Sequence, residues 1–131
     1  MRLRSRQRLS RQADFAAVRK EGRRQFGAAF VFSARIRPQS PGADLPRFAV
    51  VASRRVGKAH VRNLLKRRLR AIFREHQQIF PPEADVIVTL KAGAAGASFE
   101  ELERSFLSAA RRSGFPGRSA PPSPAVAASD A

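Results

Sequence analysis

Three stretches of the chain carry the short apolar runs that predict β-strands. From Ala28 to Arg37 apolar and polar residues alternate, as in a strand with one buried face. Residues 47–53 (RFAVVAS) are apolar on both faces, which predicts a central strand, and residues 85–90 (DVIVTL) form a β-branched run. Proline and glycine residues within 38–46 and at 81–82 separate these runs from the segments around them.

Apolar residues at helical spacing mark three further segments. The first ends at Gly22, and the longest runs from about Ala59 to Gln77. The last begins with the spacing of a capping box, Ser98 and Glu101, and ends at Gly114. The order helix, strands, helix, strand, helix predicts an α/β two-layer sandwich with the helices packed on one sheet.

The longest predicted helix has two distinct faces. On a helical wheel of about 100° per residue, an arc of roughly 140° holds the apolar residues Val61, Leu64, Leu65, Leu69 and Ile72. The opposite arc holds Arg62, Asn63, Lys66, Arg67, Arg70 and Arg74. Like charges four residues apart destabilise a helix by about 0.2–0.5 kcal/mol per pair. This face is therefore better explained as a match to external phosphate than as an ordinary solvated surface.

Composition supports a polyanionic partner. The chain has 26 Lys and Arg against 10 Asp and Glu, a formal net charge of +16, and from Arg54 to Arg74 it has nine basic residues and no acid. Such a charge repels itself unless a polyanion neutralises it, and each phosphate contact releases a condensed cation. No stretch reaches the roughly 18–20 apolar residues that span a bilayer. The absence of cysteine excludes disulfides and thiolate metal sites and suits a cytoplasmic location.

The chain is predicted to have one folded domain between two flanking segments. Residues 1–11 carry five arginines and no acid, which predicts a mobile basic arm. Residues 12–114 form a single RNA-binding α/β domain, large enough for one hydrophobic core. Residues 115–131 are rich in Pro, Ala and Ser, and we expect them to be disordered.

The segment SRRVGKAHVRNLLKRRLRAIFREH, residues 53–76, resembles the signature of the bacterial ribonuclease P protein subunit. In that family a strand ends in Ser and two basic residues, followed by Val-Gly-Lys and a helix that opens Arg-Asn-Arg. Residues 14–22 resemble the family's first helix and its closing glycine, and residues 84–103 resemble its last strand, turn and C-terminal helix. The resemblance covers about residues 7–114 and rests on the whole ordered set.

The resemblance implies a fold similar to the second domain of ribosomal protein S5, with a left-handed β-α-β crossover. It implies a function too, as the RNA-binding protein subunit of a ribonucleoprotein endonuclease that removes the 5′ leader from precursor tRNA. The implied partners are the catalytic RNA subunit and precursor tRNA, with no protein partner and no membrane. In this family the RNA subunit holds Mg²⁺ and catalyses hydrolysis, while the protein aids substrate and metal binding; we expect the protein alone to bind no metal.

The resemblance also assigns site residues. The expected RNA-binding set is Arg54, Arg55, Lys58, Arg62, Asn63, Lys66, Arg67 and Arg70. Phe15 matches an aromatic residue in a cleft between the sheet and the long helix, through which the single-stranded leader runs. A base stacked on such a ring could contribute about 1–3 kcal/mol, although plain core packing explains Phe15 equally well.

Two residues depart from the family pattern. Leu64 stands at the third motif position, where Arg is usual, so one expected RNA contact is missing. Arg68 stands where an aliphatic residue is usual, inside the predicted apolar arc, and we expect its charge to reach solvent along its stem. With no Tyr or Trp in the chain, leader stacking must rely on Phe.

No set of residues suited to a protein-only nuclease is recognisable. The glutamates within residues 100–103 are explained by the dipole of a helix start, and Asp85 is expected at the surface or in a turn. His60 and His76 are too far apart to share a metal, and we expect each to face RNA or solvent. The protein alone is therefore predicted to have no catalytic residues.

Two other functions share part of this pattern. A structural ribosomal RNA-binding protein would need the same basic helix and a small α/β fold. A membrane-surface protein would also attract basic residues, but its helix would insert the apolar face that here is needed for the core. Binding to the catalytic RNA in preference to ribosomal RNA or liposomes separates these alternatives.

Overall fold

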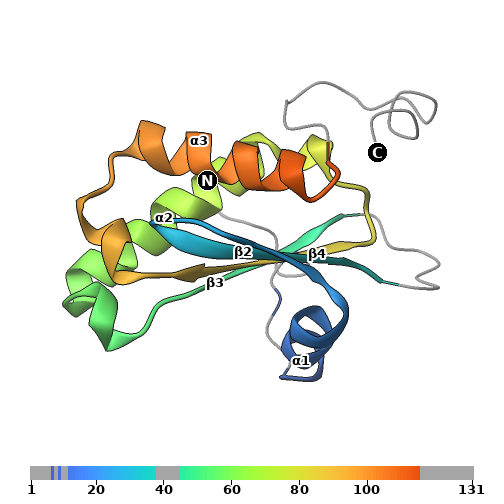
Figure 1. Ribbon diagram of the computed structural model, residues 1–131, viewed down its shortest axis with the longest axis horizontal. Coiled ribbons are helices and arrows are strands. Elements are labelled where there is room, and N and C mark those ends of the chain that lie inside the picture. The colour runs from blue at the N-terminus through green and yellow to red at the C-terminus, as the bar shows by residue number, and fades with distance from the viewer. Residues whose placement is uncertain (1–6, 8, 10–11, 38–44, 116–131) are drawn as a thin grey trace.

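The computed structural model describes residues 7, 9, 12–37 and 45–115 (Figure 1). Its helices are α1 (Gln12–Glu21), α2 (Ala59–Glu75) and α3 (Phe99–Arg112). Its strands are β1 (Arg23–Phe26), β2 (Phe30–Ile36), β3 (Arg47–Val51) and β4 (Ala84–Leu90). Short 3₁₀ turns are η2 (Arg54–Val56), η3 (Gln77–Ile79) and η4 (Ala92–Gly96).

The strands form one four-stranded sheet in the order β1-β2-β4-β3. The β1–β2 and β2–β4 pairs are antiparallel, and β3 and β4 are parallel neighbours joined through α2. This is the β-α-β crossover that the resemblance implies; its left-handed sense stays a prediction. The three predicted strands are confirmed. Strand β1 was not predicted, because its sequence RRQF is short and polar and becomes a strand only by pairing with β2.

The helices lie on both faces of the sheet. Figure 1 shows α2 and α3 together on one face and the shorter α1 on the other. Alternation along β2 matches this division, because Phe30, Phe32 and Ala34 join the main core under α2 and α3. A smaller cluster of Leu9, Val18 and Ile87 lies under α1. The predicted α/β sandwich is confirmed, and α1 partly covers the second face.

Five phenylalanine rings form the centre of the main core. Phe48 stacks on Phe73 with ring centroids 4.6 Å apart, and Phe106 meets Phe32 edge-to-face at 5.5 Å. Phe80 contacts three of these rings. These offset and edge-to-face arrangements add to the burial of large apolar side chains. The rings come from two strands, both long helices and the segment after η3, so they join the parts of the fold.

The apolar face of α2 is rotated by roughly 50° from the predicted arc. Leu65, Leu69, Ile72 and Phe73 are its buried residues. Leu64, placed in the apolar arc from the sequence, is 38% exposed, so that assignment was wrong. The physical reason is competition for one sheet surface: the ring of Phe73 buries more apolar area than Leu64 and determines which way the helix faces.

Leu69 and Leu64 provide a matched test of this orientation. Leu69 is 0% exposed, so Leu69→Ala should destabilise the protein by about 2–5 kcal/mol as a core truncation. Leu64→Ala should stay within about 0.5 kcal/mol, as for most surface substitutions. Urea unfolding followed by circular dichroism measures both, since the chain has no Trp or Tyr for fluorescence. Equal losses for the two variants would show that α2 is misoriented.

A buried ion-pair network closes one end of the sheet. Asp85, expected at the surface, is 0% exposed. Its carboxylate accepts hydrogen bonds from Arg37 Nη1 at 2.7 Å and from Arg47 Nε and Nη2 at 2.8 Å each. Arg47 also pairs with Asp14 of α1 at 3.2 Å. The hydrogen bond to Asp85 is the main cause that raises the pKa of Arg47 above its ordinary value, so its guanidinium stays charged.

The predicted capping box of α3 is confirmed. The Ser98 hydroxyl accepts from the Glu101 backbone N–H at 3.1 Å, and the Glu101 carboxylate accepts from the Ser98 N–H at 2.8 Å. The hydrogen bond from the Ser98 backbone is the largest cause that lowers the pKa of Glu101. Both contacts satisfy N–H groups that would otherwise lack partners at the start of the helix.

Two residues of the predicted arm are held against the domain. Leu9 is 4% exposed, and its backbone N–H donates to Phe48 O on the outer side of β3. Gln7 is 3% exposed and donates to Gln77 at 2.7 Å. The prediction that residues 1–11 form a mobile arm is therefore wrong for Gln7 and Leu9. At the other boundary, Phe115 packs on the core, and the rest of the predicted tail lies outside the described residues.

Among the residues that the structure describes, no helix is both long enough and apolar enough to cross a bilayer.

Candidate nucleic-acid interface

The link between β3 and α2 displays basic residues around one buried anchor. Val56 is 3% exposed and packs in the main core, while Arg54 and Arg55 of the same turn are exposed. Gly57 has φ 151°, a conformation that L side chains rarely adopt, and an added Cβ would lie 3.2 Å from Val61 Cγ1. The buried Val56 and the permissive Gly57 together hold this basic turn at the start of α2.

The N-terminus of α2 has the features of an anion site. Its N-cap is Lys58, which makes no side-chain cap, and the first turn contains no acid. The first N–H groups of a helix have no partner within the helix, and they carry the positive end of its dipole. Cationic Lys58 and the arginines of η2 lie beside them, so this end of the helix is suited to phosphate.

The predicted RNA-binding residues of α2 are all accessible, to different degrees. Asn63, Arg67 and Arg70 are exposed, whereas Arg62 and Lys66 are half-buried. Leu64 shares the exposed face with the first three, so the missing arginine of the motif leaves an apolar side chain on the outer surface. Arg68 is half-buried at the edge of the core face, as expected for a charge that reaches solvent along its stem.

None of the eight predicted side chains forms an ion pair with another residue of the described ranges. In the part of the chain that the structure describes, the carboxylates that pair with arginine are Glu21 and Asp14 of α1 and Asp85 of β4. The Nε atom of Arg62 is buried and has no hydrogen-bond partner. Within the described residues, no ion pair neutralises the basic side chains of this predicted set, which leaves their charge available to an external polyanion.

Phe15 lies elsewhere than predicted. It belongs to α1 and packs with Ala49 and Val51 on the smaller cluster, on the sheet face opposite α2. The predicted location of Phe15, in a cleft between the sheet and the long helix, is therefore wrong. Phe15 is half-buried, and the Arg19 guanidinium lies 5.8 Å from its ring centroid. The ring thus packs on the smaller cluster, stays partly accessible and has a cation over it.

A row of side chains beside α1 crosses all four strands. Phe26, Val31, Thr89 and Val51 are successive register partners, so they point to the same face. Phe26 is 67% exposed and the other three are half-buried. In the neighbouring row beneath α1, Ser33 and Ile87 are 5% and 1% exposed. Helix α1 therefore covers only part of this face and leaves the row of Phe26 accessible.

Sequence reasoning missed Phe26 and its row. Phe26 belongs to β1, which was not predicted, and the row combines residues from strands far apart in the chain. Without the sheet order, Val31, Thr89 and Val51 read only as ordinary strand residues. An exposed phenylalanine directly before Gly27 was the one available signal.

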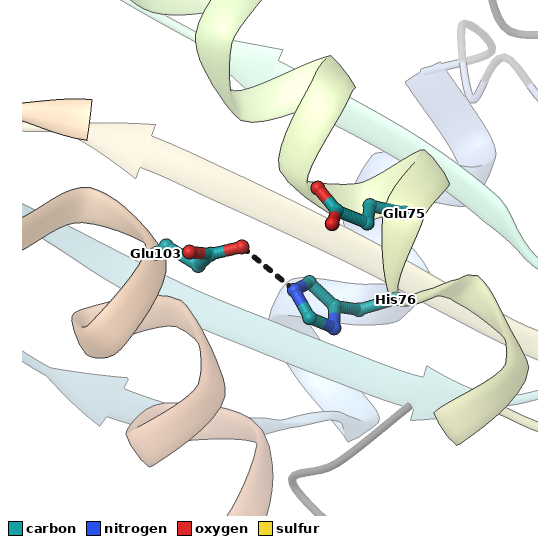
Figure 2. Close-up of side chains that lie close together, drawn as sticks. All are labelled: Glu75, His76 and Glu103. Atoms are coloured by element: carbon teal, nitrogen blue, oxygen red, sulfur yellow. Dashed lines mark hydrogen bonds and ion pairs between the residues drawn. The ribbon is translucent and has the colours of Figure 1, made fainter. Parts of the chain in front are cut away.

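Figure 2 shows His76, at the C-terminal end of α2, pointing to Glu103 of α3. His76 Nε2 lies 2.8 Å from Glu103 Oε2, and the histidine side chain is only 12% exposed. His76 therefore joins two helices, and its expected role toward RNA or solvent was wrong. His60 is exposed near the start of α2, as expected. Glu103, attributed to the helix dipole alone, has this second role.

These side chains also provide one possible grouping of metal ligands. Glu75, His76 and Glu103 each place one ligand atom within 4.8 Å of the others (Figure 2). The set combines a histidine nitrogen with carboxylates, whereas Mg²⁺ prefers an all-oxygen shell. The observed His76–Glu103 hydrogen bond already accounts for the approach of two of the three groups.

Comparisons with known proteins agree on one family. The family model described as Ribonuclease P matches residues 3–114. The ribonuclease P protein component of Acidothermus cellulolyticus is 39% identical over 103 residues, covering 78% of this chain and 83% of that protein. The solved ribonuclease P protein of Thermotoga maritima is 30% identical with a TM-score of 0.62, covering 82% of this chain and 93% of that one. The Staphylococcus aureus protein, 24% identical, supports the fold with a TM-score of 0.71, covering 81% and 94%.

Proposed function

This chain belongs to the ribonuclease P protein family, and we propose that it serves the enzyme by binding its catalytic RNA through η2 and α2. The family makes it the accessory protein subunit of an endoribonuclease of tRNA processing. The partners we propose are the catalytic RNA subunit and precursor tRNA, whose 5′ leader the enzyme removes. We propose that the protein acts in the cytoplasm, a reducing compartment with which a chain that has no cysteine is compatible.

One observation carries the RNA-binding assignment. Eight side chains from Arg54 to Arg70 form a polar, mostly cationic surface that no carboxylate of the described ranges neutralises. Arginine outnumbers lysine there, and its planar fork suits phosphate oxygens. The buried Val56 and the core face of α2 hold this surface on a rigid element. Such a surface binds the RNA backbone without requiring the protein to rearrange.

We propose that Mg²⁺ is held mainly by the RNA subunit. Within the described residues, the grouping of Glu75, His76 and Glu103 does not offer the all-oxygen shell that Mg²⁺ prefers. The protein's contribution follows from its charge. A +16 protein docked beside the RNA lowers phosphate repulsion, and less added salt is then needed to bring catalytic RNA and substrate together.

We propose that the leader passes over the sheet row of Phe26, Val31, Thr89 and Val51, with Phe15 at its side. Phe26 and Phe15 offer ring surface for stacking, which tolerates any base sequence. Arg19, beside Phe15, supplies charge for the backbone. The C-terminal end of β3 joins this face to η2, so leader and catalytic RNA would meet the protein on connected surfaces.

Phe15→Ala tests this path. It should weaken binding of precursor tRNA by about 1–3 kcal/mol, because a stacking ring is lost, and leave binding of mature tRNA, which has no leader, unchanged. Affinities of the holoenzyme for the two tRNAs measure this difference. Phe26→Ala should act in the same direction without a cost in stability, since Phe26 is 67% exposed. Equal losses for both tRNAs, or no loss with either variant, would contradict leader binding on this face.

RNA preference tests the proposed function as a whole. The protein should bind catalytic RNA more tightly than a ribosomal RNA fragment of similar length, measured at one fixed salt concentration. Liposomes of anionic lipid should not compete with the RNA. Tighter binding to ribosomal RNA would favour a structural ribosomal protein and would overturn the assignment.

A further inference from the structure

A basic groove lies between α3 and the β1 edge of the sheet. It has a volume of about 280 Å³, and its polar lining is made by Gln25, Arg104, Ser105, Ser108 and Arg112. The lining includes two arginines, two hydroxyls and an amide, and no acid. Because β1 and β3 are opposite edges of the sheet, this groove is separate from the crossover that carries η2 and α2. It is also separate from the leader row, which points to the other face.

We propose that this groove is a second site for the phosphodiester backbone of RNA. The proposal rests on the proposed function and extends it to a surface outside the family motif. Arg112 donates from Nε to its own helix at Ser108 O, at 3.4 Å, and forms no ion pair with a described residue. The terminal nitrogens of Arg112 therefore bind no carboxylate of the described residues. A phosphate group could accept two hydrogen bonds from this guanidinium.

The shape and lining favour backbone over base recognition. The floor is made by small residues, Gly27 and Ala29, and by Phe30, which is only 3% exposed and offers no stacking surface. Serine hydroxyls and amide groups commonly contact phosphate and sugar. The cavity is slightly smaller than the roughly 300–1,000 Å³ of sites for small molecules. A chain that passes through an open, basic groove fits better than an enclosed ligand.

Arg112 is a cleaner probe of the groove than Arg104. Glu101 precedes Arg104 by three residues on α3, a spacing at which opposite charges on a helix attract each other. Arg104 therefore has some compensation within the protein, and its loss would alter α3 as well. The residue next to Arg112, Arg111, is also exposed on the last turn of α3 but does not line the groove.

The test compares Arg112→Gln with Arg111→Gln in the full chain. Both variants remove one charge from the last turn of α3, so they affect helix and net charge alike. Each is titrated with catalytic RNA alone and with precursor tRNA alone, at several salt concentrations. Arg112→Gln should weaken binding to one of these RNAs by about fivefold and reduce its salt slope by about 1. The RNA that responds identifies the source of the backbone.

The double variant Arg104→Gln/Arg112→Gln should increase the loss on the same RNA. Arg111→Gln should bind both RNAs as the wild type does. The proposal is overturned if Arg112→Gln and the double variant also bind both RNAs like wild type, or if Arg111→Gln loses as much. That result would leave the proposed function standing, because substitutions in η2 and α2 test that function independently.

Discussion

Asp85→Asn is expected to destabilise the folded protein by about 3–5 kcal/mol, the cost of breaking a buried ion pair from one side. The carboxylate is 0% exposed and accepts three hydrogen bonds from Arg37 and Arg47. An asparagine has one oxygen in place of two, and its NH₂ group would face donors. Arg37, only 14% exposed, would lose its carboxylate partner, and Arg47, 22% exposed, would keep only its single contact with Asp14.

The consequence should extend beyond β4. Arg37 follows β2, Arg47 begins β3 and Asp85 lies in β4, so the carboxylate joins three strands at one end of the sheet. Urea unfolding followed by circular dichroism, at fixed ionic strength, measures the loss. Asp14→Asn is the matched control: Asp14 is 23% exposed, makes one contact of 3.2 Å with Arg47, and should cost less than about 1 kcal/mol. A neutral Asp85→Asn would show that the network does not stabilise the fold.

The second large effect is on RNA binding. The variant has four exposed arginines replaced by glutamine: Arg54, Arg55, Arg67 and Arg70. It should bind catalytic RNA about a thousandfold more weakly than the wild-type protein. This estimate takes about 1 kcal/mol for each lost phosphate contact. The slope of log affinity against log salt should fall by about 4, because fewer cations are released on binding. The half-buried Arg62 is left in place, since its Nε atom is buried and its substitution could also change the stability of the protein.

The control removes the same charge from other surfaces. Its four substitutions to glutamine are at exposed residues outside η2, α2 and the groove: Lys20, Arg24, Lys91 and Arg111. If RNA binding depended on net charge alone, both variants would lose affinity equally. We expect the control to lose less than tenfold and both proteins to give the same circular dichroism spectrum as wild type. Equal losses would contradict a defined binding surface.

Local patterns determined most of the fold from the sequence. Strands β2, β3 and β4 and the two long helices carry strong periodicity, and the capping box at Ser98 marks the start of α3. Strand β1 has no such signal, because it forms by pairing with β2. The orientation of α2 could not be predicted from its wheel, because Phe73 and Leu64 compete for one surface of the sheet.

Long-range partners explain the other differences. A buried acid is rare unless it is paired, and the partners of Asp85 lie 38 and 48 residues away in the chain. His76 meets Glu103 across 27 residues, between two helices whose contact no local pattern reveals. The basic surface was predictable because its residues lie close together in the chain, in η2 and in successive turns of α2. The row of Phe26 was not, because each strand contributes one residue.

The most direct measurement is the rate of precursor-tRNA cleavage by the catalytic RNA at low magnesium, with each protein added in turn. We predict that wild-type protein and the charge-matched control both accelerate cleavage, and that the variant lacking Arg54, Arg55, Arg67 and Arg70 does not at the same concentration. Cleavage that is equally fast with that variant, or that wild-type protein fails to accelerate, would contradict RNA docking through η2 and α2.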